Sequence, residues 1–85
     1  MTSEIILINI SGDDRPGVTA SITDILGRYN AVILDIGQAD IHHTLSLGIL
    51  FKMDNEIQSG HILKEILFKC SELGVQVRFT PIPED

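Results

Sequence analysis

Apolar residues in this chain switch repeatedly between strand spacing and helix spacing, and this alternation restricts the fold more than any other feature. Four segments have strand character, and two carry apolar side chains at the spacing of an amphipathic helix. The strand segments are residues 4–10, 31–41, 44–52 and 75–80, and the helical segments are 18–29 and 62–73. The expected order of elements is therefore strand, helix, strand, strand, helix, strand.

Several local signals place the ends and irregularities of these elements. The isoleucine-rich segment 4–10 favours a central strand that is buried on both faces. Gly37 interrupts the alternation of the second strand and predicts a β-bulge. The short break at His42-His43 predicts a hairpin, while Ser59 is a candidate N-cap and Gly74 a C-terminal stop for the second helix.

This order of elements predicts an α+β, ferredoxin-like βαββαβ sandwich. Right-handed crossovers place both helices on one face of a four-stranded antiparallel sheet, with the first and third strands in the centre. The 85 residues form one domain, residues 1–85, since a single core of this size serves one small domain. The helix residues expected in the core are Ile22, Ile25, Leu26, Ile66, Leu67 and Leu73, packed against Leu47, Ile49 and Val77.

Composition excludes several classes of function. The net charge of −6, from 12 acidic and 6 basic residues, disfavours nucleic acid as a partner, because phosphate backbones attract basic surfaces. No apolar run approaches the roughly 20 residues of a membrane helix, so no membrane association is expected. A single cysteine and no secretory leader pattern favour the cytoplasm.

No arrangement of nucleophiles or metal ligands predicts catalysis by this chain. Cys70 lies on an apolar helical stripe and is expected in the core. His42 and His43 are adjacent and would point to opposite faces, so a metal site is not expected. The serines lack a His and acid partner at any recognisable spacing. We therefore expect no catalytic residue, no metal and no cofactor.

The segment between the first strand and the first helix is the best candidate for a binding site. It reads Asp13-Asp14-Arg15-Pro16-Gly17-Val18. Free N–H groups at the helix start can receive a carboxylate, Gly17 allows close approach, and Asp13 or Asp14 can meet an ammonium group. A zwitterion would suit this site, although an ordinary strand-to-helix turn with solvated acids remains the alternative.

Two motifs on this frame resemble the ACT domain family of amino-acid-sensing regulatory modules. They are Asp14-Arg15-Pro16-Gly17-Val18 and Ile33-Leu34-Asp35-Ile36-Gly37-Gln38, and the resemblance covers essentially the whole chain. The longer match looks most like the N-terminal ACT region of bacterial phosphoserine phosphatases in serine biosynthesis. The resemblance therefore implies a regulatory fragment whose full-length chain also contains a catalytic phosphatase domain.

The resemblance also implies a ligand site shared by two copies. Family members commonly pair edge to edge through the second strand, and they bind an amino acid between the loop of one copy and that strand of the other. This assigns ligand binding to Asp13, Asp14, Gly17 and Val18 on one side, and to Val32, Ile33, Leu34, Asp35 and Ile36 on the other. Serine-sensing relatives often have Asn at the positions of Asp14 and Val32, so the preferred amino acid stays open.

Three functions are consistent with the sequence. The first is a regulatory homodimer that binds an amino acid, for which L-serine is one candidate. Its second strand has no lysine or proline that would protect an exposed edge from pairing. The second is a structural oligomerisation domain without a ligand. The third is a stand-alone ACT-type regulator of a separate protein. Calorimetry with a panel of amino acids separates the first function from the second.

Overall fold

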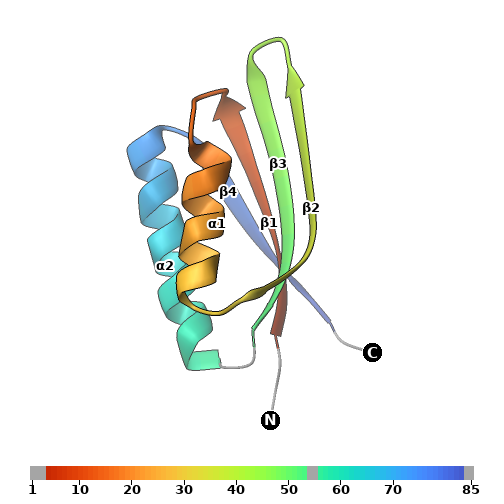
Figure 1. Ribbon diagram of the computed structural model, residues 1–85, viewed down its shortest axis with the longest axis vertical. Coiled ribbons are helices and arrows are strands. Elements are labelled where there is room, and N and C mark those ends of the chain that lie inside the picture. The colour runs from red at the N-terminus through yellow and green to blue at the C-terminus, as the bar shows by residue number, and fades with distance from the viewer. Residues whose placement is uncertain (1–3, 54–55, 84–85) are drawn as a thin grey trace.

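The computed structural model of the protein describes residues 4–53 and 56–83 (Figure 1). The elements follow the order βαββαβ. They are β1 (Glu4–Asp13), α1 (Val18–Arg28), β2 (Val32–Ile41), β3 (Thr44–Met53), α2 (Glu56–Leu73) and β4 (Gln76–Ile82). The expected order of strands and helices is confirmed.

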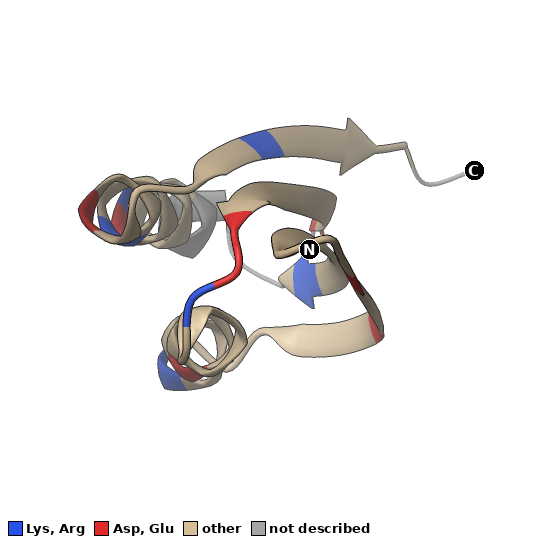
Figure 2. Cartoon of the chain, turned by 90° about the horizontal axis from the view of Figure 1, so that it is seen from above, with Lys and Arg blue, Asp and Glu red and all other residues tan. Residues whose placement is uncertain are grey.

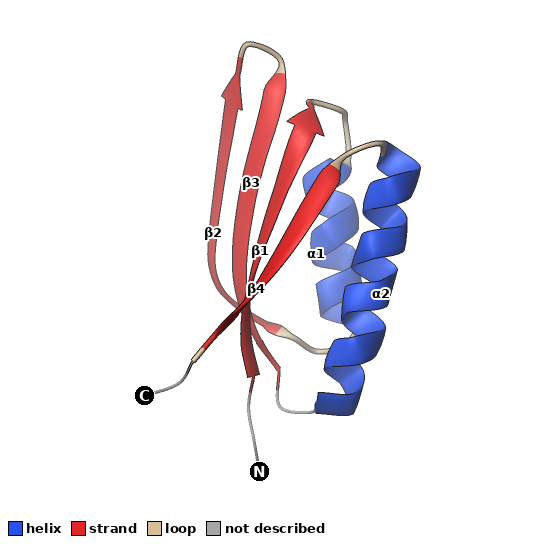
Figure 3. Cartoon of the chain, turned by 180° about the vertical axis from the view of Figure 1, so that it is seen from behind, coloured by secondary structure: helices blue, strands red, loops and turns tan. Residues whose placement is uncertain are grey.

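The four strands form one antiparallel sheet in the order β2-β3-β1-β4. β1 and β3 are central, as predicted, and β2 and β4 are the edges. Both helices lie on the same side of the sheet, which leaves its other face uncovered within one chain (Figures 1 and 3). This uncovered side is called the open face below.

β1 is buried on one face only. Ile6, Ile8 and Ile10 point toward the helices and are fully buried, because alternate side chains of a strand share a face. Leu7 on the open face is half-buried, and Asn9 is exposed. The expectation that this strand is buried on both faces is therefore wrong, since the helices cover only one side of the sheet.

α2 packs through a narrower stripe than its apolar residues indicate. Ile62, Ile66 and Cys70 are buried, and this confirms the core position expected for Cys70, where burial raises the pKa of the thiol. Leu67, expected in the core, is 55% exposed, so that assignment is wrong. Among the other predicted core residues, Ile22, Ile25, Leu26, Leu47 and Ile49 are buried, and Leu73 and Val77 are partly buried.

The sequence predicts the C-terminal end of α2 correctly but not its first residue. The helix ends at Leu73, and Gly74 follows with φ of 74°, a left-handed conformation that glycine adopts without a steric penalty. Ser59 lies within α2, which begins at Glu56, so Ser59 is not the N-cap. The apolar pattern missed the first turns of the helix because they are polar in sequence.

The irregularity in β2 lies earlier than predicted. The register between β2 and β3 shifts between Ile33 and Asp35, which makes Leu34 the extra residue of a bulge. Gly37 instead pairs regularly with Gly48. The Asp35 carboxylate accepts a hydrogen bond from the backbone N–H of Ile36 at 2.9 Å, just past the bulge.

The β2–β3 hairpin turns through His42 and His43, which confirms the predicted hairpin. Their φ angles are 52° and 64°, so both residues adopt the left-handed conformation that a two-residue type I′ turn requires. Asn-Gly is the favoured pair for such turns, and each L-residue with a bulky side chain costs about 1–2 kcal/mol in this conformation. We therefore expect the double substitution His42→Asn, His43→Gly to raise the unfolding free energy by about 1 kcal/mol, after the entropy that glycine loses on folding.

Urea denaturation of the wild type and the double variant measures this effect. His43→Ala is the matched control, because it removes the imidazole ring but keeps an L-residue at positive φ. It should give no comparable gain. A double variant that is no more stable than the wild type would show that the turn is not strained.

Neither helix, over the residues described, is long and apolar enough to cross a membrane.

Candidate functional site

The loop between β1 and α1 is tied to the tip of the neighbouring hairpin. β1 ends at Asp13, α1 begins at Val18, and the charged residues of the loop lie between them (Figure 2). The backbone N–H of Asp14 donates a hydrogen bond to the carbonyl oxygen of His43 at 3.0 Å. This bond fixes the backbone of Asp14 and leaves its carboxylate exposed.

The first turn of α1 offers uncapped N–H groups. Gly17 occupies the N-cap position with φ of 85° and has no side chain that could accept hydrogen bonds from them. The first turn contains no acidic residue, so no carboxylate of the helix itself neutralises the positive end of its dipole. A Cβ atom on Gly17 would meet no atom within 4 Å, so the approach to this helix start is open. These features suit a carboxylate group from outside the loop.

A shallow pocket of about 300 Å³ lies against this loop and is called the loop pocket below. Three of the predicted site residues, Asp14, Gly17 and Val18, line it, whereas Asp13 does not. Sequence reasoning missed the contributions from the helix and from the neighbouring strands. The full lining is Asp14, Arg15, Pro16, Gly17, Val18, Thr19, Ala20, Gln38 and Leu45.

Gln38 of β2 connects the loop pocket to the edge of the sheet. Its Oε1 accepts a hydrogen bond from the Thr19 hydroxyl at 2.6 Å, and its Nε2 donates to the Asp40 carboxylate at 3.3 Å. The residue belongs to the sequence motif that suggested the ACT family, and this was the one signal that could have identified it. Through Gln38, the loop pocket borders the unpaired side of β2.

The predicted residues Val32, Ile33, Leu34, Asp35 and Ile36 lie away from the loop of the same chain. Val32 pairs with Lys52, which pairs with Ile5 near the beginning of β1. Ile41, at the other end of β2, pairs with Thr44, which pairs with Asp13. One chain therefore does not bring the two halves of the predicted site together.

β2 is exposed along its whole length, although much of it is apolar. No other described element is exposed at every residue. β2 is this exposed because β3 pairs with only one of its edges and the helices lie mainly over the other strands (Figure 3). The exposed fractions are 54% for Val32, 40% for Ile33, 47% for Leu34, 45% for Ile36 and 72% for Ile41.

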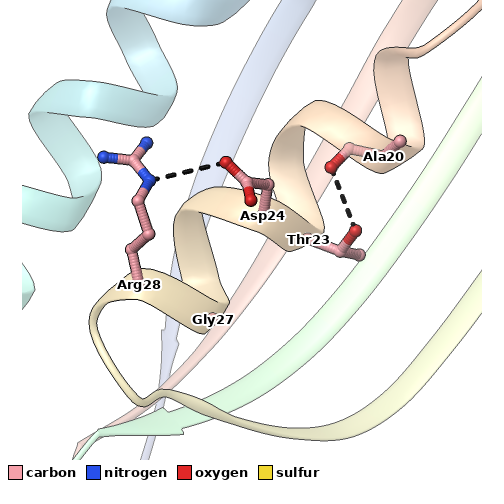
Figure 4. A pocket seen from close by; sticks show the side chains of 5 residues that line it. All are labelled: Ala20, Thr23, Asp24, Gly27 and Arg28. Carbon is pink, nitrogen blue, oxygen red and sulfur yellow. Dashed lines mark hydrogen bonds and ion pairs between the residues drawn. The ribbon is translucent and has the colours of Figure 1, made fainter.

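A second shallow pocket, of about 500 Å³, lies on the outer side of α1 (Figure 4). Arg28 supplies its positive charge, but its guanidinium is already engaged by Asp24 at 3.5 Å and by Glu65 of α2 at 3.2 Å. The carboxylate of Glu65, and to a smaller extent that of Asp24, raises the pKa of Arg28. Because the cation already has anionic partners, this pocket is a weaker ligand site than the loop pocket.

Among the described residues, no group of three or more His, Cys, Asp or Glu side chains is arranged to hold a metal ion.

The βαββαβ order and the strand-to-helix loop are those of a small ferredoxin-like domain. The sequence profile of the ACT domain family matches residues 4–80, and the chain therefore belongs to the ACT domain family. ACT domains are regulatory, non-catalytic modules that commonly dimerise and bind amino acids.

Two curated relatives and one solved structure illustrate this membership. A UPF0237 protein of Methanocaldococcus jannaschii is 33% identical over 73 residues, which cover 85% of this chain and 81% of that protein. The phosphoserine phosphatase SerB2 of Mycobacterium tuberculosis is 30% identical over 60 residues, which cover 71% of this chain and 15% of the enzyme. An ACT domain protein from Streptococcus pneumoniae has the same fold, with a TM-score of 0.80 at 16% identity, covering 94% of this chain and 91% of the other.

These relatives bear on the expected similarity to phosphoserine phosphatases in particular. Several of the matched curated proteins belong to UPF0237, and the phosphoserine phosphatase is one relative among them. The similarity thus supports the ACT family as a whole and does not single out the phosphatase.

Proposed function

We propose that this ACT domain is a regulatory module that binds a small amino acid as a homodimer paired through β2. The observation that carries the proposal is the complete exposure of the apolar edge strand β2 beside the loop pocket. An unprotected apolar edge favours pairing with another strand, and a second copy of the chain supplies one.

Self-pairing of β2 would complete the ligand site. The centre of the strand lies between Ile36 and Gly37, so symmetrical antiparallel pairing sets residues 32–35 of one copy against residues 38–41 of the other. Paired strands are about 4.8 Å apart. In this pairing Asp35 of the second copy lies opposite Gln38, which lines the loop pocket of the first.

The loop pocket offers complementary partners to the two charges of an amino acid. The N–H groups at the start of α1 suit the α-carboxylate, and the Asp14 carboxylate suits the α-ammonium group. The nearby Asp13 adds negative potential, which disfavours ligands with acidic side chains. Small neutral amino acids such as serine or glycine are therefore the expected ligands.

The relatives favour a regulator that acts on a separate protein. This chain spans about four fifths of the UPF0237 relative, at 81%, but only 15% of the phosphoserine phosphatase. The alternative, an N-terminal regulatory region joined to a phosphatase domain, is supported by the motif resemblance and by that partial match. Occupancy of the site is transmitted only if the ligand binds two arrangements of the dimer with different affinity.

Calorimetry with a panel of amino acids, combined with sedimentation equilibrium, tests this proposal. We expect a homodimer that binds a small neutral amino acid and rejects aspartate and glutamate. A dimer that binds no amino acid at millimolar concentration would instead indicate a structural oligomerisation domain. A monomer at concentrations well above micromolar would contradict the proposed pairing.

Asp14→Ala is expected to weaken amino-acid binding about tenfold or more. The substitution removes a charge-assisted hydrogen bond worth roughly 1.5–3 kcal/mol, and about 1.4 kcal/mol corresponds to a factor of ten in Kd. The backbone bond from Asp14 to His43 does not involve the side chain, so the loop should keep its conformation. Calorimetric titration of the variant measures the change.

Asp13→Ala is the matched control, because Asp13 carries the same charge but does not line the loop pocket. It should change the affinity less than Asp14→Ala does. Equal affinities for wild type and Asp14→Ala would exclude Asp14 as the ammonium partner, even if an amino acid binds.

A further inference from the structure

A separate pocket lies on the open face of the sheet, across the two strands farthest from β2. It has a volume of about 290 Å³ and is lined by Asn9, Ser11, Gln76, Val77 and Arg78. We call it the open-face pocket. β1 and β4 build it together, because Asn9 pairs with Arg78 and Ser11 pairs with Gln76.

All four polar side chains at this pocket can donate hydrogen bonds. Arg78 contributes a guanidinium, Asn9 and Gln76 contribute amide NH₂ groups, and Ser11 contributes a hydroxyl. No carboxylate lines the pocket. All four polar side chains belong to exposed residues, and none bonds or forms an ion pair with another described residue.

Arg78 forms no ion pair with another described residue, although the chain as a whole is acidic. Asp13 lies four residues beyond Asn9 on β1, which corresponds to about 13 Å along the strand. Asp35 lies on β2, three strand spacings or about 14 Å across the sheet. Both distances exceed the Debye length of about 8 Å at physiological salt, so neither acid compensates Arg78 effectively.

Asn9 borders two glycines of the neighbouring strands on the open face. Gly48 pairs with Asn9 from the other side, and a Cβ atom on Gly48 would lie 3.8 Å from Asn9 Oδ1. Gly37 follows on β2 in the same cross-strand row. An oxyanion that contacts Arg78 would accept a hydrogen bond from the NH₂ group of Asn9 and not meet Oδ1, which is itself an acceptor.

We propose that the open-face pocket is a second binding site, selective for an oxyanion such as a carboxylate or a phosphate group. Arg78 provides charge-assisted and bidentate hydrogen bonds, while Asn9, Ser11 and Gln76 provide neutral donors around it. The site lies at the opposite edge of the sheet from β2. It is therefore independent of the amino-acid site at the loop pocket and of pairing through β2.

NMR titration of the isotope-labelled chain with inorganic phosphate, and separately with acetate, tests this site. We expect saturable shifts at the amides of Asn9, Ser11 and Gln76 with a Kd in the millimolar range, since the pocket is open to solvent. Arg78→Gln should weaken binding about tenfold or more. Lys52→Gln is the matched control, because Lys52 is another cation on the open face but does not line the pocket, and it should leave the Kd unchanged.

The two anions identify the source of the oxyanion. Tighter binding of phosphate supports a phosphorylated ligand, and comparable binding of acetate supports a carboxylate ligand.

The proposal is overturned if shifts do not saturate, if they occur only at residues 17–20 of the loop pocket, or if Arg78→Gln leaves them unchanged. Asn9→Ala provides a second test, since it removes a donor without removing the charge. Amino-acid binding measured with Arg78→Gln should equal that of the wild type, so the two sites fail or succeed separately.

Discussion

Ile66→Ala is expected to lower the unfolding free energy by about 2–5 kcal/mol, whereas Leu67→Ala should lower it by less than about 1 kcal/mol. Ile66 is fully buried between α2 and the sheet, and its truncation leaves a cavity as well as removing apolar contacts. Leu67 is 55% exposed, so its side chain already meets solvent and leaves no closed cavity.

Urea denaturation of the two single variants measures this difference between neighbouring residues. The pair is well matched, because the residues are isomers in adjacent positions of the same helix. Far-ultraviolet circular dichroism before denaturation checks that both variants still fold. A loss at Leu67 as large as the loss at Ile66 would show that α2 is rotated relative to its position here, or that a second copy covers Leu67.

The rotation of α2 could not be predicted from its sequence because the apolar stripe is too wide. Successive residues of an α-helix are about 100° apart, so Leu67 lies on the shoulder of a stripe centred near Ile66. Apolar residues on both shoulders are consistent with several orientations against a sheet. The contacts of Ile62, Ile66 and Cys70 with the remaining core select one of them.

The order and pairing of the elements were predictable because they depend on local signals. The switch between strand and helix spacing defines the elements, and Gly74 and the His42-His43 break mark two boundaries that the structure confirms. The position of the β2 bulge was not predictable in this way. It depends on the register with β3, in which Gly37 meets Gly48 and the extra residue falls at Leu34.

The candidate site likewise has one part that local sequence predicts and another part that depends on tertiary structure. The loop residues Asp14, Gly17 and Val18 come from one short segment, and the structure places them together at the loop pocket. Gln38 joins them only because β2 passes beside the start of α1, a tertiary relationship that no local pattern expresses. Residues 32–36 form the half of β2 that is farther from the loop, and in our proposal only a second copy brings them to the pocket.

Ile36→Lys is expected to weaken homodimerisation by a factor of about 100 or more. Ile36 is 45% exposed and lies at the centre of β2, next to the two-fold axis that antiparallel self-pairing of this strand requires. The substitution removes an apolar contact from both copies and places two lysine charges close together across the axis. Lysine at an exposed edge is also a common means of preventing strand pairing. A factor of 100 corresponds to about 2.7 kcal/mol of association free energy.

Sedimentation equilibrium over a range of protein concentrations measures the change, and Phe68→Lys is the matched control. Phe68 is 71% exposed, also carries an apolar side chain, and lies on α2, away from the β2 edge. Phe68→Lys should leave the dimer intact, because self-pairing of β2 does not bury this side chain.

Ligand affinity should fall together with dimerisation in Ile36→Lys, since the proposed site needs residues from both copies. Dissociation caused by Phe68→Lys, with Ile36→Lys still dimeric, would place the interface on α2 and would separate the ligand site from the association of the chains.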